Sequence, residues 1–481
     1  MTQFADLFDG AHGAEAIDRM RAGVIGEGMT FDGPFGRRKL IYADYTASGR
    51  ALEPVEDFIL RDILPAYANS HTEDSYCGRH TTRIRERARD YVAQCLGAGP
   101  DDEIIFVGAG VTGAINKLVG LLGLRGAPGP GPAPLVLIGP YEHHSNILPW
   151  RESIADVVEI GLDDRTGVDL ADLEAALKAA ADRPMIIGSF SAASNVTGIC
   201  TDVEAVTRLL KRYGALSFWD HAAGAPYLPL DMNPANGPAI DALFVSPHKF
   251  IGGPGASGVL AVKRSIVTES RPTFPGGGTV AFVSPWEHDY VGSLHEREEA
   301  GTPNILGDIR AALAFSVKHA IGCETIAARE AALTAQALAA WDGVPGLELL
   351  GSGAKNRLPI FSFLIRDGQG AHVHHQRITR MLSDLYGIQA RGGCVCAGPY
   401  GHRLLHISHG ESCAMRDEIL QGDESHKPGW VRLNLHYVMD DATVDEILSG
   451  VRDLAGNWDE RSKVYERDQE KAEFAGRRVE V

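Results

Sequence analysis

The sequence predicts an α/β protein with a large domain, built on a mostly parallel sheet flanked by helices, and a smaller α+β domain. Short apolar runs without polar alternation are typical of strands buried on both faces. These runs lie at 103–107, 134–139, 184–190, 215–220 and 241–246. Helically spaced apolar residues occupy 168–182 and 201–214, and the second segment opens on a Thr cap and ends at Gly214.

A change of pattern suggests where the domains divide. Gly and Pro are concentrated at 125–134, which we expect to be a surface loop, and after about residue 305 long helical patterns dominate. Two later strand candidates lie at 358–365 and 430–438. We therefore expect four parts: an N-terminal segment that packs with the small domain (1–40), a large domain (41–305), a small C-terminal domain (306–455) and a charged tail (456–481).

Composition excludes several classes of partner. The chain of 481 residues has a net charge of −17, which repels nucleic acid and anionic lipid surfaces. No run approaches the ~20 apolar residues of a membrane span. The first residues are acidic where a signal peptide is basic, so we expect a cytoplasmic protein. Seven Cys are too few for a disulfide framework and leave individual thiols open to chemistry.

A glycine-rich turn follows the run at 103–107. Gly108-Ala-Gly110-Val-Thr-Gly113 satisfies G-x-G-x-x-G. A dinucleotide site also needs an acidic residue ~20 positions later, and Glu142 comes about 30 positions later, behind a Pro-rich loop. Nicotinamide and flavin binding are therefore disfavoured, but free N–H groups at a helix N-terminus still suit a phosphate.

Lys249 follows the run at 241–246 within Ser246-Pro-His248-Lys249. A desolvated Lys at a strand end has a lowered pKa and becomes a nucleophile toward aldehydes, and Ser246 and His248 can donate to a nearby anion. Taken alone, the motif is better explained as a surface Lys in a turn.

Residues at three other strand ends decide whether Lys249 is a nucleophile or a surface residue. Asp220 ends an apolar strand, so its carboxylate needs a cationic partner such as a protonated pyridine nitrogen. Asn195 could hydrogen-bond a phenolate oxygen, and His143 could lie flat against a ring. Singly, these three residues fit a cap, a turn and a loop. Together with Lys249 and a phosphate cradle they describe a pyridoxal phosphate site.

Several motifs occur in order across about residues 40 to 440. They are YADYTASG, EHHSNILPW, SNVTG, SPHKFIGGPGASGVL, GGGTV, EAGTPNI and RGGCVCAG. In these motifs the chain resembles the class V aminotransferase family, whose members are fold type I pyridoxal phosphate enzymes. Within the family the chain is most similar to the cysteine desulfurases and selenocysteine lyases, whose motif R-x-G-x-x-C-A it matches from Arg391 to Ala397.

The resemblance implies a role for each matching residue. Lys249 would join the cofactor covalently and later act as base, while His143 would stack on the cofactor, with His144 the weaker choice. Arg432, His71 and Arg391 would contact the substrate. The cofactor-binding residues would be Val111, Thr112, His143, Asn195, Asp220, Ser246, His248, Lys249 and Thr302. The GGG segment and Thr302 would reach the neighbouring subunit's phosphate, which implies a homodimer.

The resemblance also implies a reaction. Cys396 would attack the sulfur of a cysteine-like substrate, giving alanine and a protein persulfide that passes its sulfur to an acceptor, and selenocysteine would be an alternative substrate. Arg391 and a glycine-rich loop would favour a partly exposed thiolate.

Departures from the family pattern keep alternatives open. Ala223 stands where desulfurases usually have Gln, Gly113 where they have Glu, and Cys394-Val395 where His-His is common. The C-x-C also resembles the molybdenum cofactor sulfurases. Other class V chemistry, as in epimerases, transaminases or β-elimination lyases, would leave Cys396 incidental. The stretch 398–429 is long for a simple desulfurase and could cover the site or dock an acceptor.

A zinc site formed by Cys394 and Cys396 with His402, His406 or His409 is disfavoured, because C-x-C lacks the usual C-x₂₋₄-C spacing. We therefore expect no metal. Another group of histidines is expected on a solvated turn: His372, His374 and His375.

Overall fold

The computed structural model describes residues 4, 7–8, 10–70, 72–163, 167–424, 427–467 and 474–476. The chain forms two compact units. Unit 1 comprises Met1–Ile25, Ser48–Ala193 and Thr201–Thr325, and unit 2 comprises Gly26–Ala47, Ser194–Cys200 and Ile326–Val481. Both units are assembled from separate stretches of sequence, whereas the four expected domains are contiguous. The expected domain boundaries stay predictions.

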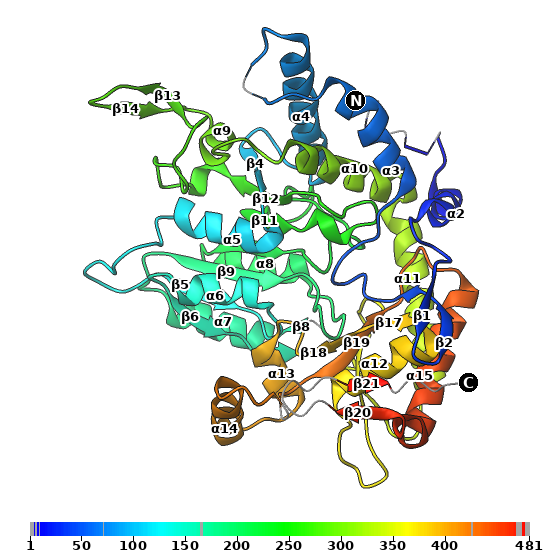
Figure 1. Ribbon diagram of the computed structural model, residues 1–481. Coiled ribbons are helices and arrows are strands. Elements are labelled where there is room, and N and C mark those ends of the chain that lie inside the picture. Colours follow the sequence, from blue (N-terminus) through cyan, green and yellow to red (C-terminus); the bar gives the residue numbers. More distant parts are fainter. Residues whose placement is uncertain are drawn as a thin grey trace. The chain divides into compact units, whose positions relative to one another are not determined.

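Unit 1 is built on a seven-stranded sheet in the order β4-β12-β11-β10-β9-β5-β6 (Figure 1). β12 is antiparallel to both of its neighbours, and the other pairs are parallel. The predicted mostly parallel sheet is confirmed, including all five apolar runs. The strands are β4 (Asp102–Val107), β5 (Leu135–Ile138), β6 (Asp156–Glu159), β9 (Ile186–Ser191), β10 (Leu216–Asp220), β11 (Ala242–Val245) and β12 (Gly258–Lys263).

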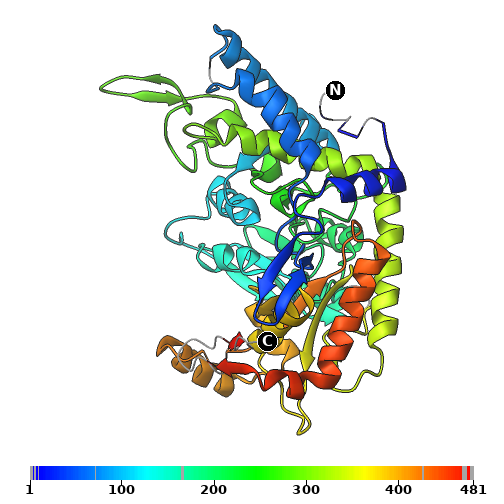
Figure 2. The same ribbon diagram turned by 45° about the vertical axis from the view of Figure 1, so that its right-hand side comes forward.

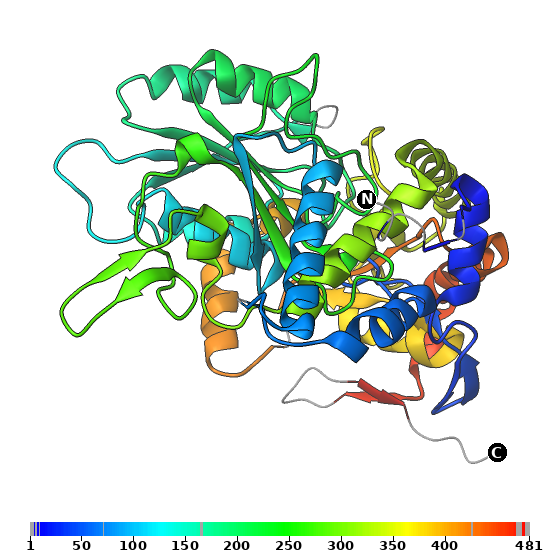
Figure 3. The ribbon, with the colours of Figure 1, turned by 90° about the horizontal axis from the view of Figure 1, so that it is seen from above.

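Helices cover both faces of this sheet. Apolar side chains of α5, such as Ile115 and Leu118, form one core with alternate residues of the strands, such as Phe218 and Phe244. On the opposite face α8 packs against β10, where Thr207 accepts a hydrogen bond from the Trp219 indole at 2.9 Å. Figure 3 shows α5 and α8 on either side of the strands. The helices of unit 1 are α2 (Gly13–Gly23), α3 (Glu53–Phe58), α4 (Tyr76–Cys95), α5 (Gly110–Leu121), α6 (Leu148–Arg151), α7 (Leu170–Ala179), α8 (Val203–Arg212), α9 (Leu294–Glu298) and α10 (Ile305–Ile321).

The predicted Thr cap of α8 is wrong by one residue. Asp202 is the N-cap, and its carboxylate accepts from the Ala205 N–H at 2.9 Å. The hydroxyl of Thr201 instead donates to the carbonyl of Ser191 at 2.6 Å. A carboxylate caps a helix as well as a hydroxyl does. Asp202 therefore caps α8, because the Thr201 side chain is turned into the core instead.

A hairpin extends from the rest of unit 1. It consists of β13 (Val280–Val283) and β14 (His288–Tyr290), which pair antiparallel and stand apart from the main sheet in Figures 1 and 2. Trp286 at its turn is 89% exposed, and Phe282 is also exposed. A short antiparallel pair, β7 (Leu162–Asp163) and β8 (Gly167–Val168), completes the strands of this unit.

Unit 2 contains a four-stranded antiparallel sheet in the order β15-β16-β19-β18, which agrees with the predicted α+β pattern. Its strands are β15 (Leu347–Leu349), β16 (Ile360–Ile365), β18 (Arg391–Gly393) and β19 (Trp430–Asn434). β3 (Ile41–Tyr42) pairs with β17 (Ile388–Gln389). The other paired strands are β1 (Thr30–Gly33) with β2 (Gly36–Lys39), and β20 (Tyr465–Arg467) with β21 (Phe474–Gly476).

The helices of unit 2 are most of α11 (Cys323–Trp341), α12 (His375–Tyr386), α13 (Gly398–Leu404), α14 (His409–Leu420) and α15 (Asp441–Ser462). α15 continues through Gly456, where the expected charged tail begins. Within the described residues, none of the helices combines the length and the apolar composition that crossing a membrane requires.

Candidate active site

Lys249 ends a tightly held turn of unit 1. The buried strand β11 runs into Ser246 and the 3₁₀ helix η4 (Pro247–Lys249). The Lys249 N–H donates to the Ser246 carbonyl at 3.0 Å, and the His248 carbonyl accepts from the Gly49 N–H at 2.9 Å. A Cβ on Gly253 would stand 1.9 Å from the Pro247 carbonyl oxygen, so only glycine permits this close approach.

Asp220 is a buried carboxylate at the end of β10. Its Oδ1 accepts from the Ala222 N–H at 2.7 Å. Burial raises the pKa of Asp220, while that hydrogen bond and the charge of Lys249 oppose the rise. A carboxylate whose ionised form is disfavoured in this way is stabilised by a cation placed beside it.

The first turn of α5 forms a cradle with the Lys249 loop. The N–H of Val111 donates to Ser246 Oγ at 3.1 Å. Gly110 has φ +57°, and a Cβ there would lie 2.7 Å from Ser246 Oγ and 2.9 Å from the His248 ring. Burial, together with the Lys249 charge, lowers the pKa of His248 to about 4, so this ring is neutral near pH 7.

His143 and Thr112 meet through Ser145, which the sequence reasoning did not single out. Ser145 Oγ lies 2.6 Å from Thr112 Oγ1 and 3.0 Å from His143 Nδ1. The Ser145 N–H donates to His143 Nδ1 at 3.1 Å, so a neutral His143 carries its proton on Nε2. Ser145 follows the two histidines of EHHSN, and that position was the available signal.

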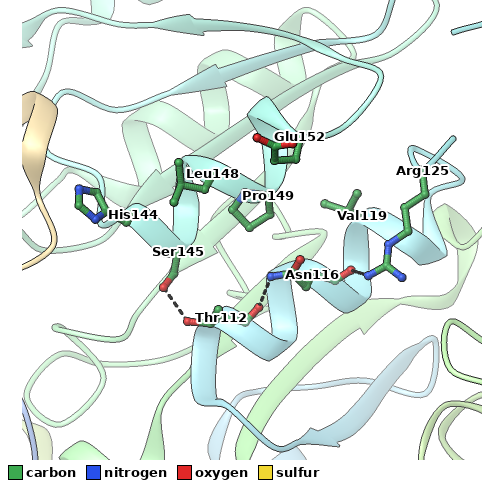
Figure 4. Close-up of a pocket in the computed structure, with 9 residues that line it drawn as sticks. All are labelled: Thr112, Asn116, Val119, Arg125, His144, Ser145, Leu148, Pro149 and Glu152. Carbon is green, nitrogen blue, oxygen red and sulfur yellow. Dashed lines mark hydrogen bonds between the residues drawn. The ribbon is translucent and has the colours of Figure 1, made fainter. Parts of the chain in front are cut away.

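A pocket of about 540 Å³ opens beside Thr112 and Ser145 (Figure 4). Its lining comes from α5 and the residue Arg125 beyond it, and from the segment His144–Glu152. Thr112 and Ser145 point toward one another at one end, while Asn116 and Arg125 lie toward the other. The wall between them is largely apolar, formed by residues such as Val119 and Leu148.

Glu142, which precedes His143, is a second carboxylate that the sequence reasoning did not assign to the site. It is fully buried and accepts from Ser191 N at 2.7 Å, Ser191 Oγ at 2.6 Å and Asn146 Nδ2 at 2.6 Å. Burial raises its pKa to about 7, although these hydrogen bonds oppose the rise. The network ties the His143 loop to the end of β9.

Thr302 lies on an exposed loop of unit 1, where its hydroxyl is 3.4 Å from Asn69 Nδ2. The loop follows Glu299, a buried carboxylate that pairs with Arg85 and Arg89. His71, the expected entrance histidine, lies outside the described residues.

Cys396 lies in a tight turn of unit 2. The Ala397 N–H donates to the Cys394 carbonyl at 3.0 Å, and the two central residues have positive φ, 45° at Val395 and 59° at Cys396. Two left-handed non-glycine residues, one of them β-branched, are strained. Cys396 is exposed and Cys394 is half-buried.

Asn195 holds this turn in place. Its side-chain amide donates to the Val395 carbonyl at 2.9 Å, and its own carbonyl accepts from Arg432 Nη1 at 3.1 Å. The sequence prediction placed Asn195 against a phenolic oxygen of the cofactor, and that role stays a prediction. The bond to the cysteine turn was not foreseen, because nothing in SNVTG points to residue 395.

Arg432 is buried in β19, and Arg391 stands directly opposite it in β18. Both bind Asp44, at 2.7 Å from Arg432 Nη2 and 2.8 Å from Arg391 Nε. Among the described residues Arg432 Nε is buried with no hydrogen-bond partner. An unpaired buried donor beside a bound carboxylate suits a second carboxylate.

The expected site residues therefore divide between the units, apart from His71. Unit 1 brings together Val111, Thr112, His143, Asp220, Ser246, His248 and Lys249, and also carries Thr302. Unit 2 brings together Asn195, Arg391, Cys396 and Arg432.

The solvated turn expected for the histidines near 374 is wrong for one of them. His375 is only 5% exposed and stacks on His374 with ring centroids 4.5 Å apart. Burial lowers its pKa to about 4. A Cβ on Gly429 would lie 2.6 Å from its Nε2, so glycine makes room for this ring. Across the part of the chain that the structure describes, no three His, Cys, Asp or Glu side chains are grouped as a metal site requires.

The residues present fit pyridoxal phosphate. The cradle beside α5 offers N–H and hydroxyl donors and a gap that a Cβ on Gly110 would fill. Asp220 supplies the buried anion that a protonated pyridine nitrogen needs, and Lys249 supplies an amine beside it.

Comparison with known proteins shows which family the chain belongs to. A protein of Streptomyces coelicolor named "Probable cysteine desulfurase" is 30% identical over 369 residues, covering 75% of this chain and 84% of that protein. The structure of a cysteine desulfurase from Thermococcus onnurineus matches with TM-score 0.72 at 25% identity, covering 87% of this chain and 95% of that one. A cysteine desulfurase of Escherichia coli has the same fold, with TM-score 0.72 at 24% identity over 92% and 98% of the two chains. The model of the class-V aminotransferases matches residues 41–446, and the chain belongs to that family.

Proposed function

We propose that this chain is a pyridoxal phosphate-dependent cysteine desulfurase, which takes sulfur from L-cysteine and leaves alanine and a persulfide on Cys396. Selenocysteine would be an alternative substrate. The observation that carries the proposal is the thiol of Cys396, exposed in a strained turn that Asn195 holds. In an epimerase, a transaminase or a β-elimination lyase of class V, such a thiol would be incidental. The sparse cysteines agree with work in the reducing cytoplasm.

Lys249, Asp220 and the α5 cradle would hold the cofactor. Lys249 would bond to its aldehyde carbon, and Asp220 would pair with the ring nitrogen. The Val111 N–H, Thr112, Ser246 and the neutral His248 would surround the phosphate. When bound, the cofactor delocalises the electron pair left on the substrate Cα when the α-proton departs.

Two residues of unit 1, Lys249 and His143, would act on the substrate and the cofactor. The amine of Lys249 would accept the proton that leaves the substrate Cα. His143 would lie against the cofactor ring, oriented by the Ser145 N–H at its Nδ1. Because that bond fixes the tautomer, Nε2 is the side of the ring that can donate.

Arg432 would bind the substrate carboxylate. Asn195 and Asp44 engage its two terminal nitrogens, and its Nε is the buried donor without a partner among the described residues. Arg391, the other arginine expected at the substrate, is engaged by Asp44 through Nε and is half exposed.

The thiolate of Cys396 would attack the sulfur of the substrate. A sulfur–sulfur bond forms as the carbon–sulfur bond breaks, and the carbon takes up a proton to become alanine. The persulfide then passes its outer sulfur to an acceptor. The helices α13 and α14 follow the turn directly, and α14 buries none of its residues, so this segment offers a surface for such an acceptor.

The proposal includes assembly of the protein as a homodimer. Phe274, Phe282, Val283 and Trp286 are all more than half exposed on or beside the β13–β14 hairpin. Exposed apolar residues gathered in one place mark an interaction surface. The Gly276–Gly278 segment and Thr302, expected at the partner's phosphate, belong to the same stretch of unit 1.

Incubation of the purified yellow protein with L-cysteine, with alanine and sulfide measured together, tests the reaction. Alanine and sulfide should form in equal amounts when a thiol reductant is present. Borohydride reduction followed by peptide mass analysis should find the cofactor on Lys249. A colourless protein that cannot be reconstituted contradicts the cofactor assignment, whereas a yellow protein that yields no alanine contradicts the reaction alone.

A further inference from the structure

Two arginines face each other across the antiparallel pair β18–β19. Arg391 and Arg432 are direct register partners, so their side chains leave the same face of the sheet. Like charges in this position repel each other. The side chain of Arg432 is 4% exposed and that of Arg391 51% exposed, so only Arg391 has water close at hand.

One carboxylate joins the two guanidinium groups. Asp44 Oδ1 accepts from Arg432 Nη2 at 2.7 Å, and Oδ2 accepts from Arg391 Nε at 2.8 Å. The Asp44 side chain is 11% exposed. Each oxygen serves a different arginine, and the three side chains together carry one net positive charge.

Backbone hydrogen bonds fix the position of Asp44. The Ala43 N–H donates to the Gln389 carbonyl at 3.0 Å, and the Asn434 N–H donates to the Ala43 carbonyl at 2.9 Å. The Ala47 N–H closes a turn onto the Asp44 carbonyl at 2.9 Å. The segment is therefore held independently of the Asp44 side chain, which can be changed without releasing the backbone.

Arg432 remains the ligand-binding member of the three. Burial lowers its pKa, and Asp44 opposes that shift, which keeps the guanidinium charged. Its Nε is buried and lacks a hydrogen-bond partner within the described residues.

We propose that Asp44 restricts this site to amino acids with a single carboxylate, because it cancels the charge of Arg391 and leaves Arg432 as the arginine that binds a substrate carboxylate. The inference rests on the proposed function, in which Arg432 binds the α-carboxylate. A neutral thiol side chain is compatible with one net positive charge, and a second carboxylate is left without a counter-charge.

The test compares two ligands that differ by one carboxylate. The dissociation constants of L-alanine and L-aspartate are measured on the holoenzyme from the change in cofactor absorbance, which needs no turnover. In Asp44→Asn the two arginines carry two net charges, and L-aspartate gains relative to L-alanine. The ratio of the two constants should shift at least about tenfold, the effect of one unit charge at roughly 10 Å and an effective dielectric of 20.

The double variant Asp44→Asn/Arg391→Gln should return the ratio to within about twofold of the parent, because it restores one net charge. Asp384→Asn is the matched control: it removes another buried carboxylate of unit 2, paired with Arg380 at 2.8 Å, and should leave the ratio unchanged.

An unchanged ratio in Asp44→Asn overturns the proposal. So does a shifted ratio that Arg391→Gln fails to restore, since a disturbed structure would not be repaired by a second substitution. A parent enzyme that binds L-alanine but makes none from L-cysteine contradicts the proposed reaction and leaves this comparison intact.

Discussion

Glu299 is the centre of a buried ion cluster in unit 1, and its replacement by Gln should strongly destabilise the protein. Glu299 Oε1 accepts from Arg89 Nη1 and from the Phe106 N–H, each at 2.7 Å. Oε2 accepts from Arg89 Nη2 at 2.9 Å and from Arg85. The carboxylate thus neutralises buried guanidinium groups of α4 and satisfies an edge N–H of β4.

The magnitude follows from what Glu299→Gln leaves behind. Two buried arginines would lose a shared counter-charge, and an amide N–H₂ would face donors that it cannot satisfy. Removing one partner of a buried ion pair costs about 3–5 kcal/mol in the free energy of unfolding. Because Glu299 begins the segment that carries Thr302, cofactor retention should also fall.

The pH dependence has a definite sign. Burial alone would raise the pKa of Glu299, but the charges and hydrogen bonds of Arg89 and Arg85 outweigh it, and the pKa lies below its ordinary value. The stabilisation is therefore present above the ordinary Glu pKa of about 4.3 and lost as the pH falls through the lower, folded-state value. The parent and Glu299→Gln should converge only in strong acid.

Urea unfolding followed by Trp fluorescence at pH 7 and fixed protein concentration measures the difference. Glu296→Gln is the control, because Glu296 lies on the exposed side of the same segment and should change the free energy of unfolding by less than about 0.5 kcal/mol. A loss below about 1 kcal/mol in Glu299→Gln, or an equal loss in the control, would refute the reasoning.

Three further predictions concern other features. Burial holds the pKa of Glu142 near 7, so the folded protein keeps a proton that the unfolded chain has released. The urea concentration at the unfolding midpoint of the parent should therefore decrease as the pH is raised from about 5.5 to about 8. Glu142→Gln should make this midpoint less dependent on pH. Cys396→Ala should slow alanine formation from L-cysteine by about 100-fold or more, whereas the rate of Cys394→Ala should stay within about twofold of the parent. Equal rates of sulfide release by the parent and Cys396→Ala would contradict the persulfide mechanism. Trp286→Ser should raise the dissociation constant of the dimer by about 30-fold or more in sedimentation experiments, and an unchanged constant would exclude the hairpin from the interface.

Sequence pattern predicted the elements that are buried on both faces. β5, β9, β10 and β11 coincide with short, mainly apolar runs, because a strand covered on both faces does not need to alternate apolar and polar residues. β18 has no such pattern: Arg391-Gly-Gly is polar and glycine-rich, and only pairing with β19 makes it a strand. β12 was not predicted, and its antiparallel direction is a matter of topology that local pattern does not encode.

The same distinction holds for the site. Lys249, Asp220 and His143 could be singled out because each lies at the end of a recognisable strand or within five residues after it, where such sheets bind ligands. Asp44 could not, since its significance depends on Arg391 and Arg432, which come from a distant part of the chain. Asn195 was singled out as a polar residue after a strand, but its bond to Val395 depends on a turn geometry unusual for Val and Cys.

The pairing of Asp44 with Arg391 also limits when unit 2 can fold during synthesis. The two residues are 347 positions apart, and a ribosome adding about 5–20 residues per second needs roughly 20–70 s to cover that interval. Throughout this period residues 26–47 have been made but the strands that flank them have not. The sheet of unit 2 can therefore form only after β19 has been made, and a chain cut before Arg391 would leave Asp44 without either of its arginine partners.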